Sequence, residues 1–184
     1  PKHWPRIAGI DFGWDHPTAA VELAWDRDAD VIYVTKAYRA RQTTVALHVA
    51  ALRPWGDWLP WAWPHDGLSH GKGGDAPLAD QYRNAGMASF LADKATFEDG
   101  GNSVEAGVLD ILDRMSTGRF KVFRHLSEWM EEFRLYHRKN GKIVDLNDDL
   151  MDATRYAVMM LRFACVKPQD RRAIDHRKRL AWVV

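Results

Sequence analysis

The distribution of apolar and polar positions predicts three strands in the first part of the chain. Residues 6–13 form a short apolar run of the kind that fits a buried strand. Residues 18–26 and 31–39 also have strand-like patterns, and a polar turn joins them. Strands connected by short turns usually pair antiparallel, so these segments predict an antiparallel meander.

The remainder of the chain alternates between helical and strand-like patterns. We expect further strands at residues 59–63, 87–96 and 120–124. Helices are expected at residues 43–52, 77–84, 103–115, 127–138 and 147–164. Ser127 and Asn147 are the expected N-caps of the last two helices, and the final helix carries the clearest apolar stripe. This order predicts an α/β fold, with a mixed β-sheet of antiparallel meander plus parallel strands flanked by helices.

Composition narrows the class of protein. The chain has 184 residues, of which 46% are hydrophobic and 28% charged, as in a single globular domain. No apolar run approaches the roughly 20 residues of a membrane-spanning helix, and the polar first residues do not resemble a signal peptide, so we expect no membrane association. The single cysteine, Cys165, excludes an internal disulfide and a cysteine-rich zinc site. Because the chain begins at Pro1 without Met, we expect it to be part of a longer protein.

The net charge of +1 conceals a basic C-terminal segment. Residues 167–184 contain six basic and two acidic residues, so that segment carries +4 and the preceding residues carry −3. We therefore divide the chain into a domain at residues 1–166 and a basic tail at residues 167–184. Two interpretations of the tail stay open: it contacts an anionic partner such as DNA, with Arg171 and Arg172 as candidate contacts, or it is a solvated, disordered extension.

Two isolated aspartates occupy positions where carboxylates are informative. Asp11 lies within the first apolar run, where a charge is costly unless it is paired or bound to metal. Asp66 follows the strand predicted at residues 59–63. If the two strands are parallel neighbours, both carboxylates lie at the same edge of the sheet, where ligands of α/β proteins collect. The alternatives are a turn-capping role for Asp11 and a simple Asp-Gly turn at Asp66.

A third acidic group opens the last predicted helix. Asp148 and Asp152 are four residues apart and Asp149 and Asp152 are three apart, so their side chains converge on one side of a helix. The alternative is a solvated acidic first turn that interacts favourably with the helix dipole. Three separated groups of carboxylates suit Mg²⁺ or Mn²⁺, and two such ions can promote phosphodiester hydrolysis. The sequence leaves open which of the three acids completes the site.

These residues resemble a known family. The Ile-Asp-Phe-Gly strand, Asp66 and the segment Asp-Asp-Leu-x-Asp-Ala-x-x-Tyr-Ala are similar to the nuclease domain of the large terminase subunit of tailed bacteriophages, across residues 6–164. RuvC-type resolvases of the same RNase H-like superfamily carry similar aspartates. The resemblance implies an RNase H-like fold with catalytic aspartates at Asp11, Asp66 and the Asp148–Asp149 pair, where Asp149 is favoured. The resolvase-like relatives add Asp152.

The resemblance also implies an activity and partners. It implies a nuclease that uses two Mg²⁺ or Mn²⁺ ions to cut concatemeric, double-stranded viral DNA during genome packaging in the host cytoplasm. The full-length protein of the family has an ATPase domain and works with a portal and a small terminase subunit. No ATP site is expected in this chain, because residues 67–73 have the wrong spacing for a phosphate-binding loop and no hydroxyl follows Lys72. His70 and Lys72 are candidate DNA contacts, or solvated loop residues.

Three rival interpretations stay open at this stage. An actin-like or sugar-kinase fold also uses an Asp-x-Gly strand with a following Thr, and detectable nucleotide binding would favour it. A resolvase or transposase nuclease shares the chemistry, and a preference for branched DNA would indicate it. A non-catalytic DNA- or protein-binding module of the same fold would show no cleavage with any metal.

Overall fold

The computed structural model describes residues 1–70, 75–144 and 146–168, and its centre is a five-stranded mixed sheet. The strands are β1 (Arg6–Asp11), β2 (Thr18–Asp26), β3 (Val31–Ala40), β4 (Trp61–Ala62) and β5 (Phe120–Val122), in the spatial order β4-β1-β2-β3-β5. The three long strands pair antiparallel, whereas β4 is parallel to β1 and β5 is parallel to β3. The predicted meander and mixed sheet are therefore confirmed.

Helices cover both faces of this sheet. The α-helices are α1 (Val45–Leu52), α2 (Leu78–Asn84), α3 (Val104–Ser116), α4 (Ser127–Leu135) and α5 (Asp149–Met159). Short 3-10 helices are η1 (Arg53–Trp55), η2 (His65–Leu68) and η3 (Leu161–Phe163), and β6 (Arg138–Lys139) pairs with β7 (Lys142–Ile143) in a small hairpin. Within the described part of the chain, no helix has the length and apolar character to cross a bilayer.

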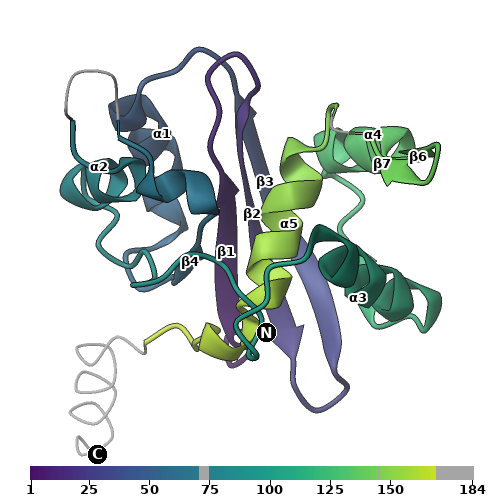
Figure 1. The fold of residues 1–184 in the computed structure, drawn as a ribbon. Coiled ribbons are helices and arrows are strands. Elements are labelled where there is room, and N and C mark those ends of the chain that lie inside the picture. The colour runs from purple at the N-terminus through teal and green to yellow at the C-terminus, as the bar shows by residue number, and fades with distance from the viewer. Residues whose placement is uncertain (71–74, 145, 169–184) are drawn as a thin grey trace, which may run out of the picture.

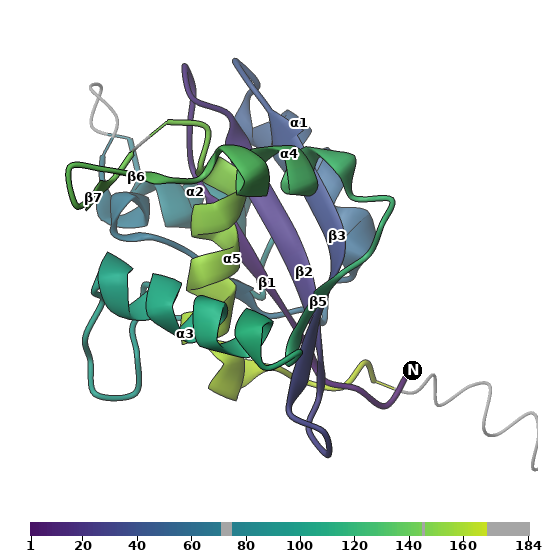
Figure 2. The ribbon, with the colours of Figure 1, turned by 90° about the vertical axis from the view of Figure 1, so that its right-hand side faces the viewer.

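The sheet separates two apolar cores. Figure 1 shows α1 and α2 on one side of the sheet and α3, α4 and α5 on the other. Because side chains alternate along a strand, Ile7 packs in the core with α5, whereas its neighbour Ala8 packs in the core with α1 and α2. Trp61 and Trp63 both lie in the second core, as the strand period predicts. Figure 2 shows α5 lying along the sheet between α4 and α3.

The strand expected at residues 87–96 is wrong. Only one isolated parallel bridge, between Phe90 and Trp61, connects this segment to the sheet. The segment instead follows β4 irregularly, and the Leu91 N–H donates to the Trp61 carbonyl. Met87 and Phe90 are both buried although they are three positions apart. That spacing does not fit the two-residue period of a strand, so the segment buries its apolar side chains without continuous pairing.

The predicted helix N-caps are also wrong in detail. Asn147 has a left-handed backbone conformation with a φ of 53°, and it turns the chain before the helix. The N-cap of α5 is Asp148, which makes no capping hydrogen bond through its side chain. Ser127 is the first residue of α4, and Leu126 is its N-cap. These shifts of one or two residues leave the order of the elements unchanged.

A glycine lets α5 pack directly on the backbone of β1. A Cβ atom at Gly9 would lie only 2.0 Å from the carbonyl oxygen of Ala153 and 3.0 Å from the Cβ of Ala157. No other residue fits there without moving the helix away from the sheet. This close approach places the first turn of α5 beside the end of β1.

Candidate metal centre at the end of the central strands

Two of the candidate acids lie where neighbouring parallel strands end. Asp11 is the last residue of β1. The parallel register pairs Gly9 with Ala62, so the chain beyond β4 leaves the sheet beside Asp11. Asp66 lies in η2, a few residues after β4, and its side chain is exposed. The expectation that the two preceding strands are parallel neighbours is therefore confirmed.

The first turn of α5 supplies the remaining acids. Asp148 is the N-cap, Asp149 is the first helical residue, and Asp152 follows one turn later. In Figure 1 the end of β1 and the start of α5 lie at the same, upper end of the sheet. Asp11 occupies the same side of β1 as Gly9, because it is two residues further along the strand, and that side faces α5.

The charges of these acids act on one another. Burial raises the pKa of Asp11 well above its ordinary range, and the negative charges of Asp152, Asp149, Asp148 and Asp66 raise it further. Each of the four other candidate aspartates is therefore near enough for its charge to affect the pKa of Asp11. We refer to Asp11, Asp66, Asp148, Asp149 and Asp152 as the acid cluster.

Asp149 and Asp152 have different surroundings. Asp149 is only 5% exposed, and burial raises its pKa, while a hydrogen bond from its own backbone and the charges of His16 and two arginines oppose that shift. Asp152 instead forms an ion pair with the buried Arg155, with Nη2–Oδ2 and Nε–Oδ1 distances of 2.7 and 3.2 Å. The hydroxyl of Tyr156 also donates to Asp152, at 3.3 Å. The charge of Asp152 is therefore balanced within α5, whereas Asp149 has no such partner on its own helix among the contacts of the described chain.

The donor set suits a divalent cation. Carboxylate oxygens are the ligands that Mg²⁺ and Mn²⁺ prefer, and a cation would relieve the repulsion that raises the pKa of Asp11. Across residues 1–70, 75–144 and 146–168, no three His, Cys, Asp or Glu side chains stand close enough to form a ready-made metal-binding group. Binding would therefore require side chains of the acid cluster to move toward a shared ion.

The candidate DNA contacts are only partly placed. His70 is exposed, and its Nδ1 is hydrogen-bonded to the carbonyl oxygen of Asp75 at 3.0 Å. Lys72, Arg171 and Arg172 lie outside the described residues. Sequence reasoning missed Arg155, although its position three residues after Asp152 on a helix is a usable signal for an ion pair.

The sheet order and the acids at its edge define an RNase H-like α/β protein. The chain belongs to the family described as "Terminase RNaseH-like domain", whose model matches residues 8–161. The chain is 52% identical over 165 residues to the terminase large subunit of Salmonella phage P22, a match covering 89% of this chain and 33% of the phage protein. The corresponding protein of Enterobacteria phage LP7 is 51% identical over 161 residues, covering 87% and 34% of the two chains. The chain therefore spans about a third of the length of these relatives.

Solved structures show the same fold. The P22 large terminase nuclease domain has a TM-score of 0.83 and 51% identity, covering 90% of this chain and 86% of that chain. The nuclease domain of the large terminase of bacteriophage SPP1, described with bound Mn, has a TM-score of 0.64 and 19% identity, covering 87% of each chain. At that lower identity the likeness shows the fold alone. The expected RNase H-like fold and terminase family are confirmed.

Proposed function

We propose that this chain is a metal-dependent endonuclease that hydrolyses double-stranded DNA during viral genome packaging. Membership of the terminase RNase H-like family supports this proposal, as does the 51% identity with the P22 terminase nuclease domain. The observation that carries it is the acid cluster itself. Asp11 ends β1 beside the end of the parallel strand β4 and the start of α5, and burial, together with the charges of four other aspartates, raises its pKa.

The acid cluster would hold two Mg²⁺ or Mn²⁺ ions. The SPP1 nuclease domain, which has the same fold, is described with bound Mn, and this supports the choice of metal. We assign Asp11, Asp66 and Asp149 as principal ligands, with Asp148 beside them. Asp152 is a further candidate ligand, because its charge has the largest effect of the four on Asp11; since it is also paired with Arg155, we expect it to contribute less than Asp149. When bound, such ions activate a water molecule and stabilise the leaving oxygen of a phosphodiester.

The protein's own residues fix where the ligands lie. The β1–β2 ladder holds Asp11, since this residue pairs with Ala19 across the two strands. The contact between Gly9 and Ala153 fixes how closely α5 approaches the sheet. Asp66 lies in η2 with an exposed side chain, which would leave it accessible to a DNA backbone.

The proposed substrate contacts are mainly with phosphates, so sequence specificity should be low. His70, Lys72, Arg171 and Arg172 are proposed contacts of this kind. By its family, the chain would act in the host cytoplasm as one part of a longer protein with an ATPase domain, together with a portal and a small terminase subunit. We place no ATP site in this chain.

Plasmid digestion tests the proposal directly. Supercoiled plasmid is incubated with the wild-type chain in Mg²⁺, Mn²⁺, Ca²⁺ or EDTA, and cleavage is expected with Mg²⁺ or Mn²⁺ and not with EDTA. Asp66→Ala should reduce cleavage by at least about a hundredfold, because it removes a carboxylate that the reaction needs. Asp57→Ala is the matched control, since Asp57 is exposed and only weakly paired with Arg53, at 3.5 Å. Absence of cleavage with every metal contradicts the proposed activity, and full cleavage by Asp66→Ala contradicts the site.

A further inference from the structure

The start of α5 is held by a residue from another helix. The first N–H groups of a helix have no acceptor within the helix and usually bond to an N-cap side chain. In α5 the N-cap Asp148 makes no such side-chain bond. Instead the N–H of Leu150, the second helical residue, donates to Oε2 of Glu132 on α4, at 2.7 Å. This bond is buried, and it joins α4 to the turn that carries Asp149.

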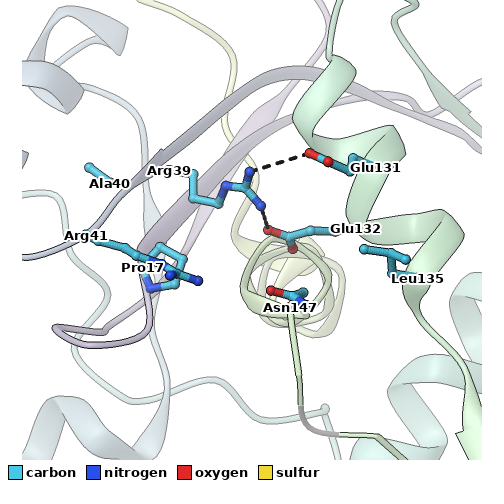
Figure 3. A pocket seen from close by; sticks show the side chains of 8 residues that line it. All are labelled: Pro17, Arg39, Ala40, Arg41, Glu131, Glu132, Leu135 and Asn147. Atoms are coloured by element: carbon cyan, nitrogen blue, oxygen red, sulfur yellow. Dashed lines mark hydrogen bonds and ion pairs between the residues drawn. The ribbon is translucent and has the colours of Figure 1, made fainter.

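The other oxygen of Glu132 is anchored to the sheet. Arg39 near the end of β3 donates through Nη1 to Oε1 of Glu132 at 2.7 Å, and the Glu132 side chain is only 1% exposed. Figure 3 shows this ion pair, with Arg39 extending from its strand toward α4. The neighbouring Glu131 is 65% exposed and lies 3.7 Å from Nη2 of the same arginine. The Glu132 carboxylate therefore connects β3 to the beginning of α5.

The bridge lines an open cavity that also contacts Asn147, the residue before Asp148 of the acid cluster. The cavity has a volume of 430 Å³, and Arg39, Arg41, Glu132 and Asn147 are among its lining residues (Figure 3). Arg39 and Arg41 are also near enough to Asp149 to lower its pKa against the effect of burial. The bridge thus adjoins the residue that we assign as the third ligand.

We propose that Glu132 is a positioning residue for the metal centre: it fixes the first turn of α5, and with it Asp149, relative to β1. This inference rests on the proposed function. The contact at Gly9 secures α5 at Ala153, one turn beyond Asp149. The first turn of α5 lies before that contact along the helix. In this turn, Glu132 accepts a buried hydrogen bond from the N–H of Leu150. Groups that orient metal ligands commonly change metal affinity by about 10–100-fold when they are replaced.

The test compares Glu132→Gln with its neighbour Glu131→Gln. Glutamine keeps the size of the side chain, but Arg39 and Leu150 donate to different oxygens of Glu132, so one of these donors would face the amide NH2 group, which cannot accept. Glu131→Gln removes a charge from the same helix and beside the same arginine, without touching α5. Binding of Mn²⁺ alone to the 184-residue chain is measured by titration calorimetry, at a temperature where circular dichroism shows all variants to be folded.

The expected result is that Glu132→Gln weakens Mn²⁺ binding at least about tenfold, while Glu131→Gln stays within about twofold of the wild type. A lowered melting temperature with unchanged Mn²⁺ affinity in Glu132→Gln overturns the inference and leaves the proposed function intact. Failure of the wild type to bind Mn²⁺ overturns the proposed function and the inference with it.

A second measurement needs no variant at Glu132. The Leu150 amide proton of the wild-type, metal-free chain should exchange with solvent slowly, because Glu132 accepts its hydrogen bond within the protein. Exchange at the rate of an unstructured chain overturns the inference, even if Glu132→Gln does not fold.

Discussion

Replacing Gly9 by alanine tests whether the contact between β1 and α5 positions the acid cluster. The added Cβ would lie 2.0 Å from the carbonyl oxygen of Ala153, whereas ordinary contacts begin at 3.4 Å. The obstacle is backbone, so no change of rotamer relieves it, and α5 must retreat by at least about 1 Å. Overpacking of this kind costs about 1–3 kcal/mol of stability. A displacement of about 1 Å at reacting groups commonly costs about a hundredfold in rate.

Two measurements distinguish a loss of folding stability from a displacement of α5. Urea unfolding and Mn²⁺-dependent plasmid nicking are measured for Gly9→Ala and for Ala8→Gly. Ala8 adjoins Gly9 on the same strand but faces the opposite core, so its replacement should cost about 1 kcal/mol without moving α5. We expect nicking to fall about a hundredfold in Gly9→Ala and by less than about threefold in Ala8→Gly. Equal nicking by both variants would refute the positional argument.

Three further outcomes follow from the acid cluster and its supports. Asp149→Asn should weaken Mn²⁺ binding at least about tenfold and Asp152→Asn less, because Asp152 is already paired within α5; equal losses in calorimetry would contradict this assignment. Burial and neighbouring acids raise the pKa of Asp11 well above 3.8, so the folded, metal-free chain retains a proton there that the unfolded chain releases. The free energy of unfolding should therefore fall as pH rises from about 4 through the folded pKa of Asp11. In Asp11→Asn the unfolding free energy should depend less steeply on pH, and an unchanged pH dependence would contradict this prediction. Trp129→Phe removes the donor of the 2.9 Å bond to Thr154 and should cost about 1 kcal/mol in urea unfolding, with Mn²⁺ affinity unchanged; no measurable loss of stability would contradict that value.

The fold was largely predictable because its main elements follow simple local patterns. The strands of the meander are apolar segments bounded by polar turns, and the last helix carries an apolar stripe with the 3.6-residue period. Residues 87–96 were wrongly predicted as a strand because their apolar composition is strand-like. In the structure only Phe90 of this segment forms a β-bridge, with Trp61. The left-handed turn at Asn147 depends on how the chain enters α5, which no local pattern encodes.

The sequence indicated which aspartates are candidates for the acid cluster, but not which side chains contact each of them. Strand ends and helix starts are visible in sequence, so Asp11, Asp66 and the α5 acids could be selected as candidates, and their role as metal ligands stays a prediction. The distinction between Asp149 and Asp152 depends on the partner of Asp152, and that ion pair became visible only in the structure. Arg39 and Glu132 lie 93 positions apart, and no periodicity connects such residues, so the bridge was not found from sequence.

The order in which the acids appear along the chain has a consequence for synthesis. Asp11 and Asp66 belong to the first half of the chain, whereas Asp148, Asp149 and Asp152 arrive only with α5. A nascent chain leaving the ribosome can pair β1, β2 and β3 through local turns long before α5 is made. A translation product that stops before α5 therefore lacks the acid cluster, however much of the sheet it has formed. Assembly of the cluster is delayed until nearly the whole domain has been translated.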